Sequence, residues 1–175
     1  ASAMSSTPGA VVVAVAPYRN TGAAEERPGF NYDSGTSTWS ANSEMLSLKS
    51  DVADILAANA LAGTQVSVVS PVYTYLTISV SATALSAVRA SDAEVIIKQA
   101  IIDRFDYARA QFGAQVYLTD LIALISSLGV SSAVTINVLK RSTVSGTVAT
   151  DVLATDDELL LLLTSGLTVT ISGGA

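Results

Sequence analysis

Apolar residues recur with a helical period between Ser91 and Phe112, while polar and charged residues occupy the opposite side of the helical wheel. Ser91 and Glu94 have the spacing of a capping box, in which each side chain bonds the other residue's backbone amide. Gly113 follows directly and suits the left-handed residue that ends many helices. The pattern predicts a helix over 91–112 with this apolar stripe: Ile97, Ile101, Phe105, Ala108 and Phe112.

A strict alternation precedes this helix, between Val66 and Ala82. The even positions are mostly aliphatic and the odd positions mostly polar, which is typical of a strand with one buried face. Pro71 lacks a backbone donor, so we expect a bulge, a bend or the start of a second strand near Ser70–Pro71. The free face of the sheet would carry Tyr73, Tyr75, Thr77 and Ser79.

The remaining segments add two helices and three strands. Apolar runs or alternation predict strands over 11–16, 130–138 and 167–171. A helix capped by Asn42 or Ser43 should end at Gly63 and present Met45, Leu48, Val52, Ile55 and Asn59 on one face, and another should run from Thr119 to Gly129. This order predicts an α+β fold: a two-layer sandwich with about three helices packed on one face of a mixed four- to five-stranded sheet.

The length of 175 residues suits one domain. We expect residues 1–8 to be a flexible N-terminus or a cloning remnant, with Ala1–Ala3 preceding Met4, and residues 9–175 to form a single α+β domain. Gly, Pro, Ser, Thr and Asn are frequent over 18–43, which predicts a long loop. The N-terminus lacks a positive region before an apolar core, so it does not resemble a signal peptide.

Half of the residues are hydrophobic but only 14% are charged, and the net charge is −6. The mean hydropathy is positive, which predicts that part of the apolar surface binds a partner. Nine scattered Lys and Arg residues argue against nucleic-acid binding. The longest apolar runs, 10–16 and 159–163, are far shorter than the roughly 20 residues of a membrane span.

Candidate chemistry is sparse. The chain has no histidine and no cysteine, which removes the commonest general base and metal ligand and every thiolate site. The carboxylates Asp156, Asp157 and Glu158 are adjacent, an arrangement more typical of a solvated turn than of a metal site. A Ser–Lys pair is formally possible, but nothing indicates which serine. We therefore expect no catalysis, no cofactor and no metal.

Three aromatic residues are the candidate interface residues: Trp39, Tyr73 and Tyr75. Trp39, the only tryptophan, lies near the end of the predicted loop. It either attaches that loop to the core or anchors a partner. Tyr73 and Tyr75 belong to the predicted free face of the sheet.

The central block also resembles a known family. The segments Gln65-Val-Ser-Val-Val-Ser-Pro-Val-Tyr, Gln111-Phe-Gly, Val116-Tyr-Leu-Thr-Asp-Leu-Ile and Leu128-Gly-Val occur in an order similar to that of the C-terminal part of the baseplate J-like proteins. These are wedge components of contractile phage tails and related injection particles. The strand after Pro8 and the helix before Gly63 also match the family's order, although Leu128 stands where proline is frequent in that family.

The resemblance implies a structural subunit of a baseplate wedge, assembled in a bacterial or archaeal cytoplasm and located in the tail baseplate of a virion or tail-like particle. Its partners would be other baseplate wedge proteins and copies of itself, as a homo-oligomer or a ring, with neither nucleic acid nor a membrane span involved. The alternative from another class is a cell-surface or secreted ligand-binding module, favoured by the Ser-, Thr- and Ala-rich composition and the loop around Trp39. An enzyme ranks third.

Overall fold

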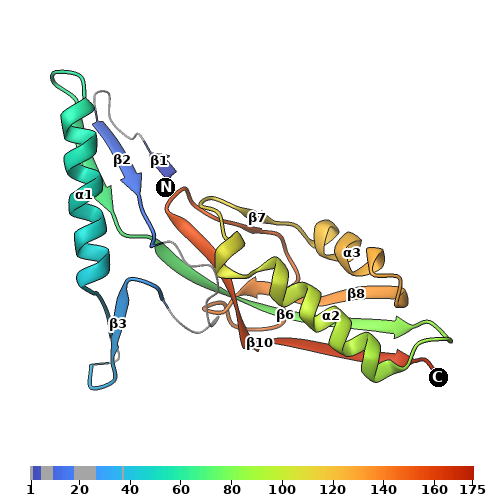
Figure 1. The fold of residues 1–175 in the computed structure, drawn as a ribbon. Helices are drawn as coiled ribbons and strands as arrows, with labels where there is room; N and C mark the ends of the chain where they lie inside the picture. Colours follow the sequence, from blue (N-terminus) through green and yellow to red (C-terminus); the bar gives the residue numbers. More distant parts are fainter. Residues whose placement is uncertain (1, 5–9, 18–26, 37) are drawn as a thin grey trace.

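A computed structural model of the chain describes residues 2–4, 10–17, 27–36 and 38–175. Two three-stranded sheets, each covered by helix, make up most of this part of the molecule, and the smaller sheet stands at an angle to the larger one (Figure 1). The α+β class, with helices packed on sheet, is confirmed. The strands divide between separate sheets, however, and do not form the single sheet of four to five strands that the sequence suggested.

The elements follow one another along the chain with these bounds: β1 Ser2–Met4, β2 Ala10–Ala14, β3 Phe30–Asp33, β4 Thr38–Ala41, α1 Ser43–Asn59, β5 Gln65–Val69, β6 Val72–Ala84, α2 Ala90–Arg104, a 3-10 helix Tyr107–Arg109, β7 Gln115–Val116, α3 Leu118–Ser127, β8 Ser131–Arg141, β9 Val152–Leu153 and β10 Glu158–Gly173.

The larger sheet has the order β10-β6-β8, with β10 parallel and β8 antiparallel to β6. Helices α2 and α3 cover one face of it, and the main core lies between them and the even-numbered residues of β6. Ile78, Val80, Ile97, Ile101 and Ile125 are fully buried there. The helical stripe and the strand alternation thus meet in one core, as the sequence predicts.

Strand β10 is buried on both faces in its first half. Leu160 and Leu162 belong to the main core, whereas Leu159 and Leu161 pack against Tyr73 on the other side of the sheet. A strand covered on both sides favours apolar residues at successive positions, which explains the leucine run 159–163. The pairing with β6 shifts register between Leu162 and Leu167, and the second half of the strand then alternates.

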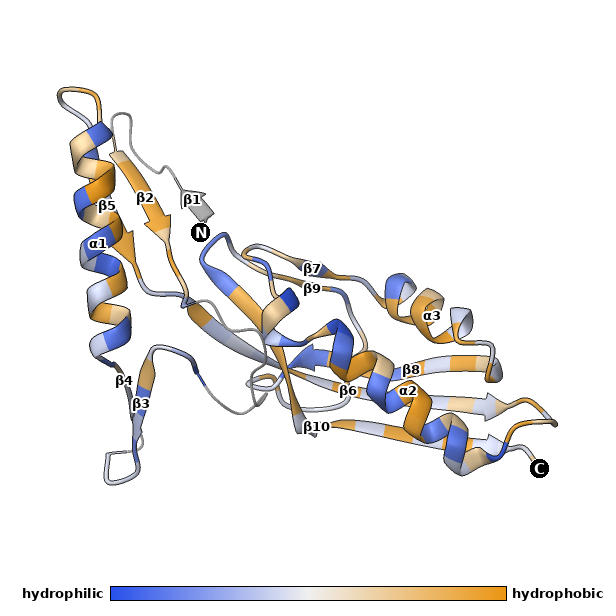
Figure 2. Ribbon diagram, viewed as in Figure 1, coloured by the Kyte–Doolittle hydropathy of each residue, from blue (hydrophilic) through white to orange (hydrophobic). Residues whose placement is uncertain are grey.

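The smaller sheet has the order β1-β2-β5 and carries α1 on one face. Figure 2 shows β2 and β5 as hydrophobic along most of their length. Val13, Val15 and Met45 form the centre of this second core. Ile55, predicted on the buried face of α1, is instead 63% exposed, because Leu48, Val52 and Leu56 fill that face.

Asn42 is the N-cap of α1, and its side-chain oxygen accepts a hydrogen bond from the amide of Met45 at 3.1 Å. We expect Asn42→Ala to lower the free energy of unfolding by about 1 kcal/mol, because an amide of the first turn loses its acceptor. Urea denaturation followed by circular dichroism measures the change. The matched control is Ser43→Ala at the exposed next residue, which should change stability by less than about 0.5 kcal/mol; equal losses would contradict the capping role.

Helix α2 ends earlier than predicted. It stops at Arg104, and residues 107–109 form a separate 3-10 helix. The cause is Asp106, whose extended backbone breaks the helix and whose carboxylate accepts a hydrogen bond from the amide of Ala108 at 2.9 Å. The capping box is also absent: Arg89 is the N-cap, and Glu94 pairs with Lys98 at 2.5 Å.

Other boundaries agree with the sequence more closely. The strand pattern is interrupted at Ser70–Pro71, as predicted: β5 ends there in the smaller sheet, and β6 then begins in the larger sheet. Gly129 ends α3 with a positive φ of 67°. Helix α3 begins at Leu118, ahead of the predicted cap Thr119, because Asp151 accepts a hydrogen bond from the amide of Leu118 at 2.9 Å. The region predicted as a loop contains the hairpin β3–β4, and residues 18–26 lie outside the described residues.

Candidate functional site

An aromatic cluster joins the two sheets. Tyr73, at the start of β6, is buried, and its hydroxyl donates to the carbonyl of Pro28 at 2.8 Å. Its ring meets Phe30 of β3 edge-to-face, with 5.8 Å between the ring centroids. Tyr107, from the 3-10 helix, donates to the carbonyl of Pro17 at 2.6 Å. These contacts tie the segments before β3 and after β2 to the larger sheet.

Arg27 extends this cluster toward the surface. Its guanidinium carbon lies 4.8 Å from the centroid of the Trp39 ring and 5.4 Å from that of Tyr75, within the range of cation–π attraction. Tyr32 also packs against Trp39, with 5.1 Å between the two ring centroids. The Tyr75 hydroxyl is buried and has no hydrogen-bond partner within the described ranges.

The three aromatic residues singled out from the sequence therefore lie in one neighbourhood. Arg27 bridges Trp39 and Tyr75, and Tyr73 packs beside Tyr75. The placement of Tyr73 on a free face is wrong, because it is buried between the hairpin and the 3-10 helix. Trp39 is half-buried, and its ring contacts Tyr32 of the same hairpin and the guanidinium of Arg27. Burial raises the pKa of the Tyr73 hydroxyl above its ordinary value, with the Tyr107 hydrogen bond adding to the effect, so it stays a donor.

The carboxylates at 156–158 do not form a uniform solvated turn. Glu158 is only 2% exposed, and both of its oxygens accept hydrogen bonds from the guanidinium of Arg141. Its Oε2 also accepts from the amide of Thr155 at 3.1 Å, and Arg141 donates to the carbonyl of Leu153 at 2.8 Å. Asp156 is exposed beside this pair. Glu158 thus fastens the start of β10 to the end of β8 and has a structural role.

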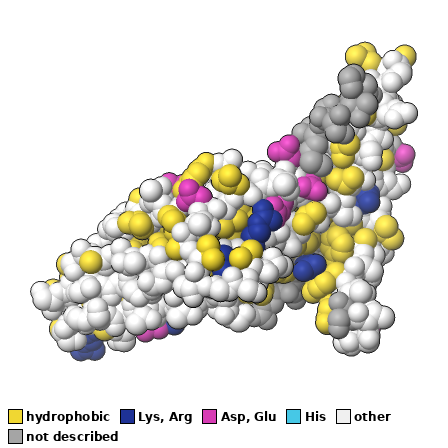
Figure 3. All heavy atoms as spheres, turned by 180° about the vertical axis from the view of Figure 1, so that it is seen from behind, with side chains coloured by type: hydrophobic (Ala, Val, Ile, Leu, Met, Phe, Trp, Pro, Cys, Tyr) yellow, Lys and Arg dark blue, Asp and Glu magenta, His cyan; other side chains and the backbone are white. Residues whose placement is uncertain are grey.

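The face of the larger sheet opposite α2 and α3 is lined by hydroxyl side chains. Figure 3 shows this face from behind, at the lower left, where most of the surface is white and carries few charged or hydrophobic side chains. Asn137 donates to the hydroxyl of Ser81 at 2.6 Å, and the hydroxyls of Thr83 and Ser172 lie 3.3 Å apart. The residues that line a shallow pocket on this face are Ser81, Ala82, Thr83, Ala133, Thr135, Thr170 and Ser172.

The α1 layer exposes several large apolar side chains. Leu46 is 58% exposed and Leu61, in the turn after the helix, is 82% exposed. A pocket runs between the second half of α1 and β5, and alanines of the helix, Leu61 and Val66 line it. Strand β5 is the last strand of its sheet, so one of its edges has no partner strand within the described chain.

The described residues hold no cluster of three or more carboxylates that could bind a metal ion. None of the described helices combines the length and the hydrophobicity needed to cross a bilayer. No protein-family model matches the chain, and no curated protein matches it.

Proposed function

We propose that this protein is a structural subunit of a larger assembly, namely of the baseplate wedge of a contractile tail or a related injection particle. It would bind copies of itself and other baseplate proteins and would carry out no catalysis. The observation that carries the proposal is the α1 layer, which stands away from the larger sheet and exposes large apolar side chains (Figure 1).

Exposed apolar side chains next to an unpaired strand edge support an assembly role. Leu61 and Val66 line the pocket along α1 and β5, and exposed apolar patches mark protein contacts in many soluble proteins. An unpaired edge can accept a strand from a neighbour, which fixes register through backbone hydrogen bonds. Together these features suit a neighbouring subunit that covers the flank of α1 and extends the smaller sheet.

A ring requires two different contact surfaces on each subunit, because closed rings form through heterologous interfaces. The α1 layer supplies one of them in this proposal. The hydroxyl-lined face of the larger sheet is the candidate for the second, since it is open and lies on a different part of the molecule (Figure 3). Small hydroxyl side chains allow close approach and can hydrogen-bond across an interface.

The substitution Leu61→Asp tests the proposed contact of the α1 layer. It is expected to reduce co-sedimentation of the protein with particles at least tenfold, because a charge would be buried without a partner in the assembled interface. Leu61 is 82% exposed, so the variant should keep the wild-type melting temperature.

The control variant Ser145→Asp adds the same charge at an exposed loop residue. Gradient sedimentation of lysates that express each variant, with immunodetection of the chain, gives the comparison. Wild-type levels of Leu61→Asp in the particle fraction would exclude the α1 layer as a contact surface.

A ligand-binding module is the second candidate function. The observation that favours it is a pocket of about 220 Å³ at the end of α2, with an apolar floor and two arginines.

A further inference from the structure

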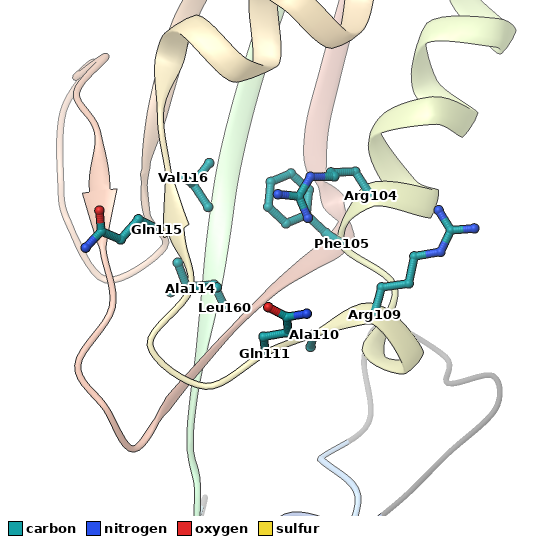
Figure 4. Close-up of a pocket in the computed structure, with 9 residues that line it drawn as sticks. All are labelled: Arg104, Phe105, Arg109, Ala110, Gln111, Ala114, Gln115, Val116 and Leu160. Atoms are coloured by element: carbon teal, nitrogen blue, oxygen red, sulfur yellow. The ribbon is translucent and has the colours of Figure 1, made fainter. Parts of the chain in front are cut away.

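The pocket at the end of α2 is built from four segments of the chain. Arg104 and Phe105 lie at the C-terminal end of α2, and Arg109 and Ala110 at the end of the 3-10 helix. Gln111, Ala114 and strand β7 supply the third segment, and Leu160 comes from β10 (Figure 4). Phe105, Val116 and Leu160 are buried core residues. The pocket therefore has a rigid apolar floor that the main core holds in place.

Its polar groups are cationic or neutral. In Figure 4 the Arg104 side chain lies beside the Phe105 ring, with 5.9 Å between the guanidinium carbon and the ring centroid, and Gln111 turns toward the same space. Within the described part of the chain, neither Arg104 nor Arg109 forms an ion pair with a carboxylate. Both arginines stand at the ends of helical segments, where the exposed carbonyls favour a positive charge, yet their guanidinium donors stay available.

From this arrangement we infer a binding site for a small organic acid that carries one apolar group. The carboxylate would be bound by Arg104, since a guanidinium presents paired donors that match the two oxygens. Arg109, whose side chain is directed away from the Phe105 ring in Figure 4, would add a second positive charge at the rim of the pocket. The apolar group would enter the space above Phe105, Val116 and Leu160. A cavity of about 150 Å³ holds a benzene ring, so a pocket of about 220 Å³ accommodates a phenyl group with its carboxylate at the opening.

The local charge of the pocket differs in sign from the charge of the whole chain. The net charge is −6, and an anion attracted to this protein needs a local excess of positive charge. The described lining of the pocket contains two arginines and no carboxylate. A neutral ligand of the same shape would gain the apolar contacts but not the charge-assisted hydrogen bonds, which are roughly twice as strong as neutral ones.

Phenylacetate and its neutral analogue phenylacetamide are suitable probes, titrated into the full chain at millimolar concentration and followed by amide chemical shifts in NMR. We expect phenylacetate to give saturable shifts at Ala110, Ala114 and Val116, and phenylacetamide to bind about tenfold more weakly, the equivalent of one charge-assisted hydrogen bond. Equal binding of both probes, shifts spread over the whole surface, or no saturable shifts would overturn the site.

Two variants test the assignment of residues. The double substitution Arg104→Gln with Arg109→Gln removes both charges at exposed positions and should abolish the preference for phenylacetate over phenylacetamide. The control is Arg89→Gln, at the exposed opposite end of α2, which should retain that preference. A preference that survives the double substitution would contradict the roles of the two arginines. This inference is independent of the assembly proposal, because ligand binding by the isolated chain does not require a particle.

Discussion

Replacing Glu158 with alanine is expected to lower the free energy of unfolding by about 1–3 kcal/mol, the cost of leaving partly buried donors without their acceptor. The substitution removes both acceptors of the Arg141 guanidinium and leaves the amide of Thr155 without its side-chain partner. It also opens a cavity at the start of β10, where Glu158 is 2% exposed. Urea denaturation followed by circular dichroism measures the loss.

The neighbouring exposed residue supplies a matched control. Asp156→Ala removes the same kind of charge at a position without a side-chain hydrogen bond in the described structure, and should change stability by less than about 0.5 kcal/mol. The double variant Glu158→Leu with Arg141→Met replaces the pair by apolar groups and should be more stable than Glu158→Ala, because no unpaired charge stays buried. If Glu158→Ala lowered the free energy of unfolding no more than Asp156→Ala, the ion pair would not contribute to the stability of the fold.

The second large effect is expected at Tyr73. Tyr73→Ala should lower the free energy of unfolding by about 3–5 kcal/mol, as for other buried aromatic residues. The variant loses the contacts with Phe30 and Tyr107 and the hydrogen bond to the carbonyl of Pro28. Because these contacts join the two sheets, the unfolding transition should also broaden as the smaller sheet unfolds separately.

Two further variants divide the Tyr73 effect into its parts. Tyr73→Phe removes only the hydroxyl and should cost about 1 kcal/mol, the usual value of one hydrogen bond. Tyr32→Ala removes an aromatic ring that is 53% exposed in the hairpin and should cost less than about 1 kcal/mol. Similar losses for Tyr73→Ala and Tyr32→Ala would show that the cluster does not hold the sheets together.

Periodicity predicted the central core correctly because one period dominates each segment. The apolar residues of α2 and β6 that the sequence assigns to buried faces, such as Ile97 and Ile78, are buried in the structure. The helix end was wrong because a single competing side chain, Asp106, decides it. The single sheet was wrong because alternation shows which residues share a face but not which strands are neighbours.

Glu158 shows where a signal existed and was overlooked. Leu160 and Leu162 lie on the buried face toward α2 and α3, and extending their period-2 phase backwards places Glu158 on the same face. Arg141 lies on the same face of the sheet, because it pairs with Leu76, which belongs to the main core. The three adjacent carboxylates suggested a solvated turn, whereas the alternation separates the buried one from its neighbours.

The aromatic cluster and the pocket could not be predicted in the same way. Arg27 reaches Trp39 and Tyr75 across sequence separations that no periodic pattern records. The pocket combines the end of α2, the 3-10 helix, β7 and β10, and both arginines line it in a chain whose α2 ends at Arg104. Sites of this kind depend on tertiary packing, which alternation and composition do not determine.

The central claim is that the chain is part of a particle, and its most direct test is the composition of particles from the source organism. Lysates are prepared after induction of any resident phage, particles are pelleted and purified on a gradient, and their peptides are identified by mass spectrometry. The proposal predicts peptides of this chain in the same fraction as sheath and tube proteins. Peptides found only in the soluble low-mass fraction, while sheath and tube proteins sediment, would contradict it.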